Sequence, residues 1–453
     1  MRKRVTAIVM ALAVIGSMFG GCKRKEPEEK VIRVMALTSE VPNLIQMYLD
    51  MHPELGYTME LTYNEYADGD YWSFLDASFA GEIEEKADIY IAVSDYAAKY
   101  VVGSMSTYAA TYDDLGIPTE QLIEESQTAA YAVEAGTRTS DGKVVALPYT
   151  SEVGCFIYRR SIAKEVWGTD DPVVIQEKIG GGSGTWDAFW NAAEELKEKG
   201  YAIVSGDGDL YWAMHNSMDS GWIEDGELRL SPNREAFLDI SKRLRDNGYS
   251  NGTVVRSDEW RVDIAGNGEK EVFGFIGPSW MIHYEMSDYC GDDPLTEEYE
   301  GTYGDWAVCN APVGFHLTGT WVMANKDVVD MEKKEVVADI IKWMTLDYDE
   351  DSLQYLIANG LYEPQHGEKF AVVSGTVMES ADGSMDFLSG QDMFEYYRIA
   401  NDQEMDFYLT EYNPAIEYLW QIAVREYAEG KKTREEAIAG FKAAVKEKFP
   451  EYS

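Results

Sequence analysis

The N-terminal part of the chain alternates short apolar runs with segments whose apolar residues recur at helical spacing. This pattern predicts strands at Val31–Leu37, Tyr57–Tyr63 and Ala87–Val93, and helices at Pro42–Met51 and Tyr71–Ala80. Strands that are apolar along their whole length are typical of parallel strands covered by helices on both faces. The fold class expected from this region is therefore α/β.

A second α/β set begins after Pro148 and has the same alternation of strands and helices. The further predicted elements are a helix capped by Thr185 that runs to Lys199, a helix at about 234–246, the strand Val272–Ile276, an amphipathic helix around 336–344, and a last helix that opens with the capping box Thr433 to Glu436. Trp186, Trp190 and Trp343 fall at core spacing on these helices and are expected to pack inside.

The N-terminus carries the pattern of an exported lipoprotein. Basic residues 2–4 precede the apolar run Val5–Phe19, and two glycines then precede Cys22. This resembles a bacterial lipobox, in which residues 1–21 are the signal peptide and Cys22 becomes the lipidated N-terminus. Residues 22–30 lack apolar side chains beyond the cysteine and are expected to form a tether. An ordinary secretory signal with an unmodified Cys22 is the alternative.

Composition narrows the function classes. With 39 Lys+Arg against 81 Asp+Glu among 453 residues, the formal net charge is −42 at pH 7, which excludes a partner held through its phosphates. Only 4 Cys and 5 His are present, which leaves little room for a structural zinc cluster. No metal site and no cofactor is assigned from the sequence. Cys155 is predicted to be a small buried hydrophobe, whereas Cys290 and Cys309 are left open as a disulfide pair.

The sequence lacks two common enzyme motifs, but residues that could bind a ligand follow the predicted strands. The chain has neither a His-Glu-x-x-His nor a Gly-x-Ser-x-Gly motif. Glu40 follows the first strand, Asp95 the third, and Trp280 the strand Val272–Ile276. Ligands of open parallel sheets bind at such ends. The 12 Trp, 30 Tyr and 15 Phe add flat faces that suit sugar rings.

Seven short stretches occur in the order found in one protein family. They are Asn43–Pro53, Ala87–Val93, Leu147–Arg160, Thr185-Trp186, Phe275–Trp280, Gly319–Lys326 and Asn413–Ala415. From about residue 31 to 449, the chain thus resembles the extracellular solute-binding proteins of carbohydrate ABC transporters, of the maltose-binding type.

The resemblance implies a two-lobe fold like that of type II periplasmic binding proteins, with a hinge and a ligand cleft between the lobes. Lobe one is expected at 31–148 plus 325–400, and lobe two at 149–320 plus 401–453. The hinges are expected near Pro148–Val153, Thr320–Ala324 and residues 400–410.

The same resemblance implies a set of ligand-binding residues at the seam. They are Asp95, Glu152, Tyr211, Trp212, Trp280, Trp321 and Trp420, and Glu40 joins them through its place at a strand end. Ser279 separates Trp280 from the Gly-Pro that usually precedes this tryptophan directly, so Trp321 is an alternative to it.

Structural roles remain open for several of these residues. Trp420 suits a core position, Asp95 a helix N-cap, and Glu152 a surface ion pair. If their segment is extended, Tyr211 and Trp212 point to opposite faces, so one of them is expected to face the cleft.

The function that the resemblance implies is a monomeric substrate-binding lipoprotein, held on the extracellular face of the cell membrane by its lipid. It would capture a neutral oligosaccharide and deliver it to the permease subunits of an ABC transporter, without catalysis. Two alternatives remain: a binding protein for a cationic or peptide ligand, because Glu40, Asp95 and Glu152 converge, and a cell-surface glycoside hydrolase, because acidic pairs are abundant.

Overall fold

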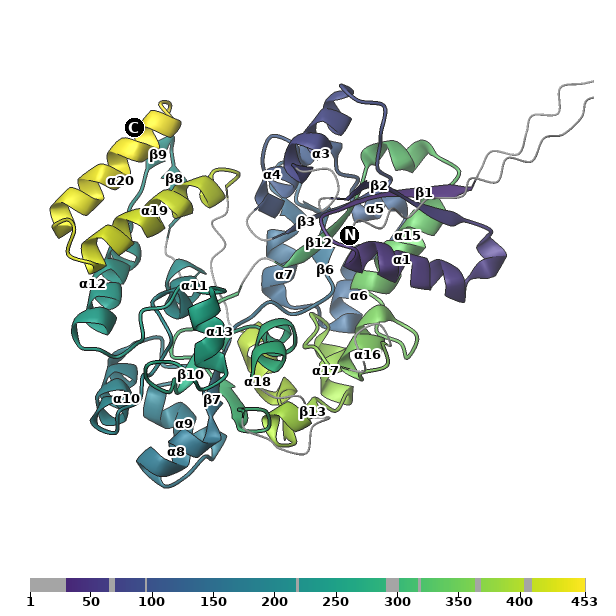
Figure 1. Ribbon diagram of the computed structural model, residues 1–453. Coiled ribbons are helices and arrows are strands. Elements are labelled where there is room, and N and C mark those ends of the chain that lie inside the picture. The colour runs from purple at the N-terminus through teal and green to yellow at the C-terminus, as the bar shows by residue number, and fades with distance from the viewer. Residues whose placement is uncertain are drawn as a thin grey trace, which may run out of the picture.

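The protein folds into two α/β lobes that are joined at their base (Figure 1). The computed structural model describes residues 30–64, 70–93, 96–216, 220–290, 301–316, 319–362, 368–402 and 410–452. Cys22, Asp95 and most of the hinge expected at 400–410 lie outside these ranges. No helix in the described part of the chain has the length and apolar character needed to cross a bilayer.

Lobe one, on the right in Figure 1, is built on a five-stranded sheet of order β2-β1-β3-β12-β6. The strands are β1 (Val31–Ala36), β2 (Thr58–Asn64), β3 (Ile89–Val93), β6 (Leu147–Pro148) and β12 (Thr320–Ala324). β2, β1 and β3 run parallel, which confirms the arrangement expected from their sequence, whereas β12 is antiparallel to β3 and β6.

Successive side chains of the lobe-one strands point to opposite faces, and each face has its own core. Val34 on β1 packs with Leu44 of α1 (Glu40–Met51) and Ile341 of α15 (Lys334–Thr345). Met35 packs on the other face with Leu75 of α3 (Tyr71–Ala80). The remaining helices of this lobe are η1 (Pro53–Leu55), α4 (Ala97–Val101), η3 (Ser106–Tyr108), α5 (Tyr112–Leu115), α6 (Thr119–Ser126), α7 (Ala130–Ala135), η5 (Lys326–Asp330), α16 (Leu353–Ala358) and α17 (Gly375–Ser380).

Lobe two has a three-stranded antiparallel sheet of order β10-β7-β11. Its strands are β7 (Cys155–Arg159), β10 (Gly274–Gly277) and β11 (Trp306–Asn310). Its helices are α8 (Arg160–Trp167), α9 (Pro172–Ile179), α10 (Asp187–Glu198), α11 (Gly208–Asn216), α12 (Pro232–Asp246), α13 (Asp258–Ile264), α14 (Ser279–Met281), α19 (Asn413–Ala428) and α20 (Arg434–Lys448).

Two predicted helix starts can be compared with the structure. The capping box of α20 is confirmed, because the Thr433 hydroxyl accepts from the Glu436 N–H and the Glu436 carboxylate accepts from the Thr433 N–H. The predicted cap of α10 is wrong by one position, since Trp186 occupies the N-cap. The Thr185 N–H instead donates to the Ser183 hydroxyl.

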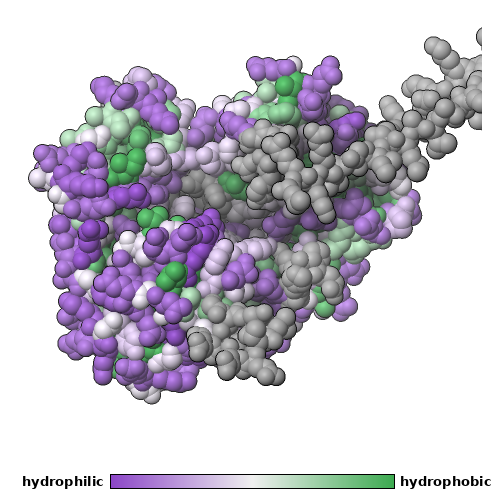
Figure 2. Space-filling model, viewed as in Figure 1, coloured by the Kyte–Doolittle hydropathy of each residue, from purple (hydrophilic) through white to green (hydrophobic). Residues whose placement is uncertain are grey.

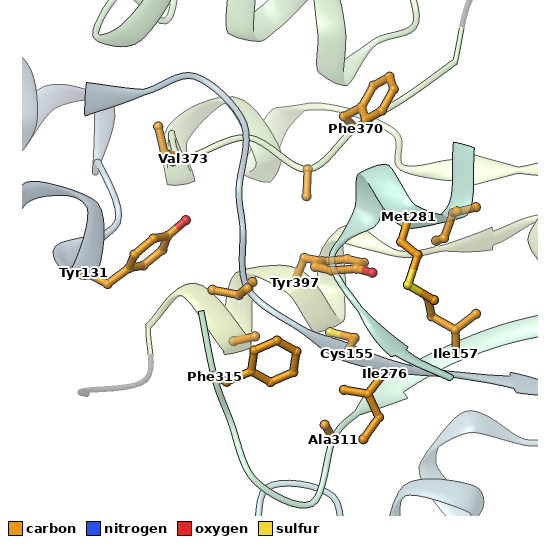
Figure 3. Close-up of a cluster of buried hydrophobic side chains, with 14 of the residues drawn as sticks. Tyr131, Cys155, Ile157, Ile276, Met281, Ala311, Phe315, Phe370, Val373 and Tyr397 are labelled. Atoms are coloured by element: carbon orange, nitrogen blue, oxygen red, sulfur yellow. The ribbon is translucent and has the colours of Figure 1, made fainter. Parts of the chain in front are cut away.

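The lobes share an apolar cluster at their base (Figure 3). Cys155 of β7, Met281 of α14, Phe315 and Tyr397 are all buried there. Tyr397 belongs to α18 (Phe394–Asn401), which the expected boundary assigns to lobe one. α18 packs on β7 and β11 of lobe two and also on α17 of lobe one. The Tyr397 hydroxyl donates to the Gly277 carbonyl at 3.3 Å, so this helix connects the two lobes.

The described cysteines are unpaired and buried. Cys155, Cys290 and Cys309 are free thiols, so the disulfide left open from the sequence is not formed. Burial raises the pKa of the Cys155 thiol.

The molecular surface in Figure 2 is mostly hydrophilic, and its hydrophobic residues lie in small groups. This agrees with the large share of charged residues in the sequence.

Trp420 lies in the core of lobe two, which is the structural role that the sequence left open for it. It is 1% exposed on α19. Its ring centroid is 6.1 Å from Trp222 and 5.0 Å from Phe441 of α20. A tryptophan enclosed in this way has no free face on which a ligand could stack, and Trp420 therefore holds α19 against α20.

We expect Trp420→Ala to lower the free energy of unfolding by about 3–5 kcal/mol, because it leaves a cavity between two helices. Urea denaturation measures this change. The matched control is Tyr418→Ala in the same helix, which removes a side chain that is 66% exposed and should cost much less. Equal stability of the two variants would contradict the core assignment.

Candidate functional site

Glu152 lies on the crossover between β6 and β7 and is 5% exposed. The Thr150 hydroxyl donates to Oε1 at 2.8 Å, and the Trp280 indole Nε1–H donates to Oε2 at 2.6 Å. The Glu152 backbone N–H donates to the Tyr131 hydroxyl at 3.0 Å. The surface ion pair considered for Glu152 is thus wrong, because the carboxyl is buried and hydrogen-bonded within the seam.

The environment of Glu152 favours its neutral form. Burial raises the pKa of this carboxyl to about 7, against the opposing effect of the hydrogen bonds from Thr150 and Trp280. The nearby carboxylate of Glu40 also raises the pKa of Glu152. Glu152 is therefore a carboxyl that is partly protonated near neutral pH.

Glu40 brings lobe one to the same place. It is the first residue of α1, directly beyond β1, where the N-terminal end of the helix favours an acidic side chain. Glu40 is half-buried, and the buried Tyr149 hydroxyl hydrogen-bonds to it. Burial raises the pKa of Glu40, and the bond from Tyr149 lowers it. The carboxyl of Glu40 in lobe one and that of Glu152 in the crossover between β6 and β7 thus interact at the seam.

Trp280 reaches this seam from lobe two. It is half-buried in α14, directly after β10 and Gly277-Pro278. Ser279, which departs from the family pattern, is fully buried and its hydroxyl accepts the Ala371 N–H at 3.0 Å. Because Ser279 turns inward, Trp280 turns toward Glu152. The inserted serine therefore leaves Trp280 at the seam.

Arg256 is a part of this site that sequence reasoning missed. Its guanidinium lies over the Trp280 ring, 5.3 Å from the centroid. The Nε of Arg256 pairs with Glu285 Oε1 at 2.8 Å. Its φ of 66° is a left-handed conformation that non-glycine residues rarely adopt. No sequence motif marks such a residue, because neither its backbone conformation nor its contact with Trp280 follows from local spacing.

The other predicted aromatics lie elsewhere. Trp321 is 1% exposed on β12, inside the second core of lobe one, so it does not replace Trp280. Tyr211 and Trp212 lie on α11 and not on an extended segment, which corrects the expected geometry. Tyr211 is buried and Trp212 half-buried, and both line a separate cavity within lobe two.

The described site has no metal centre. Within the ranges given above, no group of three or more His, Cys, Asp or Glu side chains is arranged to hold a metal ion. The seam thus offers the indole face of Trp280, the Glu152 carboxyl that can donate as well as accept, the Glu40 carboxyl and the Tyr149 hydroxyl. These groups suit reversible binding of a compound rich in hydroxyls.

Comparison with known proteins connects this geometry to a family. The model of the bacterial extracellular solute-binding proteins matches residues 44–389. A search of curated proteins found no match.

Solved structures share the fold at low sequence identity. An extracellular solute-binding protein of family 1 is 15% identical with a TM-score of 0.70, over 92% of this chain and 99% of that one. The GacH receptor of Streptomyces glaucescens, solved with acarbose, is 14% identical with a TM-score of 0.61, over 94% and 100%. A binding protein of B. animalis subsp. lactis in complex with β-1,6-galactobiose is 16% identical with a TM-score of 0.58, over 94% and 99%.

We expect Glu152→Gln to change the pH dependence of stability. Because the folded pKa of Glu152 is raised to about 7 from 4.5, the folded state binds the proton more tightly than the unfolded state. The contribution of this group therefore falls as pH rises through that window, by on the order of 3 kcal/mol. Glutamine retains the acceptor for Trp280, so the variant should gain stability relative to the native chain at about pH 8 compared with about pH 5.

Thermal unfolding at several pH values measures this difference. Glu435→Gln, in the exposed first turn of α20, is the control and should not alter the pH profile. A difference between Glu152→Gln and the native chain that stays constant across this pH range would contradict a buried, largely neutral carboxyl.

Proposed function

The chain belongs to the bacterial extracellular solute-binding proteins, and on that basis we propose that it captures a neutral oligosaccharide outside the cell and delivers it to the permease of an ABC transporter. The ligand site is the seam formed by Glu40, Tyr149, Glu152 and Trp280. No covalent chemistry is part of this function.

The observation that carries the proposal is the contact between Trp280 and Glu152. The indole is fixed by its Nε1–H bond to a buried carboxyl, so its ring is held in one orientation. A sugar can place its C–H face on such a ring while its hydroxyls exchange hydrogen bonds with Glu40 and Glu152. Structural relatives solved with acarbose and with β-1,6-galactobiose are consistent with a sugar ligand.

The two lobes supply the mechanism of capture. Glu40 comes from lobe one and Trp280 from lobe two, so a ligand that contacts both favours the closed form over the open form. The apolar cluster at the base gives the lobes a common pivot. A polar contact also connects the lobes, since the Ser104 hydroxyl of lobe one donates to Glu411 of lobe two at 2.6 Å. Closure is the state that the permease recognises.

The place of action follows from the N-terminal pattern. We propose that Cys22 carries the lipid and that residues 23–30 tether the folded lobes to the extracellular face of the cell membrane. This arrangement keeps the protein, acting as a monomer, close to its permease.

A cationic or peptide ligand is the second candidate, and the convergence of Glu40 and Glu152 favours it. The two candidates differ in their electrostatics. A charged ligand would be held by Coulomb attraction, which salt screens, whereas a neutral sugar would not.

We expect Trp280→Ala to weaken oligosaccharide binding about ten- to a hundredfold, because it removes the stacking face and the donor to Glu152. A thermal-shift screen with glycans of defined linkage identifies the ligand, and calorimetry then measures affinity. Tyr418→Ala, which removes an exposed aromatic ring on α19, is the control and should bind normally. Normal affinity in Trp280→Ala would remove the indole from the site.

We expect the affinity for that ligand to be almost independent of ionic strength, because a neutral sugar forms no ion pair with the protein that salt could screen. Calorimetry in low and high sodium chloride measures this directly. A steep loss of affinity with added salt would favour the cationic ligand over the neutral oligosaccharide.

A further inference from the structure

Lobe two contains a cavity of about 390 Å³ that belongs to this lobe alone. It lies between α11, α12, α19 and the segment 250–255. Its volume falls within the range of small-molecule sites. Because residues of lobe one do not line it, its shape does not depend on closure of the lobes.

One wall of the cavity is aromatic and aliphatic. Tyr211 packs edge to face on Trp212 and on Phe237, with distances between ring centroids of 5.5 Å and 5.3 Å. Leu244 of α12 and Val424 of α19 complete this wall. Such a wall accepts the flat or C–H-rich face of a ring.

The lining also contains two arginines that share one carboxylate, because both Arg245 and Arg425 interact electrostatically with Glu429. Arg245 and Arg425 lie in the last turns of α12 and α19 and are exposed. Within the described residues, neither guanidinium group makes a hydrogen bond or a salt bridge.

The two carboxylates of the lining are already engaged. Asp207 accepts a hydrogen bond from the Ser241 hydroxyl. Glu429 pairs with Lys431 at 2.5 Å. Glu429 thus interacts with Lys431 and with both guanidinium groups, which leaves a local excess of positive charge in a protein with a net charge of −42. Such an excess suits an anion.

The cavity is separate from the seam although the two are neighbours along the chain. Val255 lines the cavity, and the next residue, Arg256, lies over Trp280. The left-handed backbone at Arg256 is the point at which the chain turns from one site to the other. No residue is shared between the cavity lining and the Glu40–Glu152–Trp280 site.

We propose that this cavity is a second ligand site, which binds a six-membered ring bearing one carboxylate. The ring lies against Tyr211, Trp212 and Phe237, and the carboxylate is held by Arg245 and Arg425. Both an acidic sugar and an aromatic acid have this chemistry.

The test measures binding of methyl β-D-glucuronide and of phenylacetate to the folded protein by saturation-transfer NMR and calorimetry. Methyl β-D-glucoside is the neutral match for the glucuronide. We expect one of the two acids to bind, and Arg245→Ala combined with Arg425→Ala to weaken that binding about tenfold or more. Binding of the glucuronide identifies a sugar acid as the source, and binding of phenylacetate an aromatic acid.

Two variants serve as controls. Arg229→Ala removes an exposed arginine of lobe two that does not line the cavity, and Trp280→Ala removes the indole of the seam. Both should bind the acid normally. The proposal is overturned if neither acid binds, if the glucoside binds as well as the glucuronide, if the double arginine variant binds normally, or if Trp280→Ala abolishes binding.

Discussion

A carboxyl buried where the chain passes between two lobes imposes the geometry of the seam. The oxygens of Glu152 need hydrogen-bond donors, because an unsatisfied buried acceptor costs on the order of 1–3 kcal/mol. Thr150 supplies one donor and Trp280 the other. The segment that leads from lobe two into β12 also passes close to Glu152. A Cβ on Gly319 in this segment would lie 2.4 Å from the Glu152 Cγ, so only glycine fits there. Glu152 thus determines both the orientation of Trp280 and the close packing of the two segments that connect the lobes.

The hinge follows from how apolar contacts are distributed between the lobes. Each lobe has its own sheet, and the cluster of Cys155, Met281, Phe315 and Tyr397 joins them at the base. A Cβ on Gly154 would lie 1.8 Å from the Phe315 ring, which shows how tightly this base is packed. Away from the base, the exposed Ser104 and the half-buried Glu411 join the lobes through a hydrogen bond. Such a contact between polar groups breaks more easily than the apolar base, so the proposed closure of the lobes would turn about the base.

The sequence predicts elements and local chemistry well where these depend on nearby residues. The strands and helices of lobe one, the capping box at Thr433, and the positions of Glu40 and Trp280 at strand ends follow from periodicity. Trp420 could not be placed in the same way. Its burial depends on Trp222 and Phe441, which are distant in the chain. A stacking tryptophan and a core tryptophan on an amphipathic helix have the same local pattern.

The contacts of α18 and the backbone conformation of Arg256 were also beyond local reasoning. α18 packs on the sheet of lobe two because Tyr397 reaches Gly277, a contact over 120 residues of chain. Arg256 takes a left-handed conformation without glycine, so the turn that brings its guanidinium over Trp280 has no signature in composition. In both cases tertiary packing determines the outcome, and neighbouring residues do not.

The acidic composition suggests that the seam binds cations, but burial of its carboxyls lowers the negative charge of the seam. Burial raises the pKa of Glu152 to about 7, and burial also raises that of Glu40. Each carboxyl makes the other harder to ionise, so near neutral pH the pair carries less charge than two free glutamates would. A protonated carboxyl can donate to a hydroxyl as well as accept from one, which a carboxylate cannot. The burial that lowers the charge of the seam also allows Glu152 to exchange hydrogen bonds with hydroxyl groups in both directions, which supports the proposal of a neutral ligand.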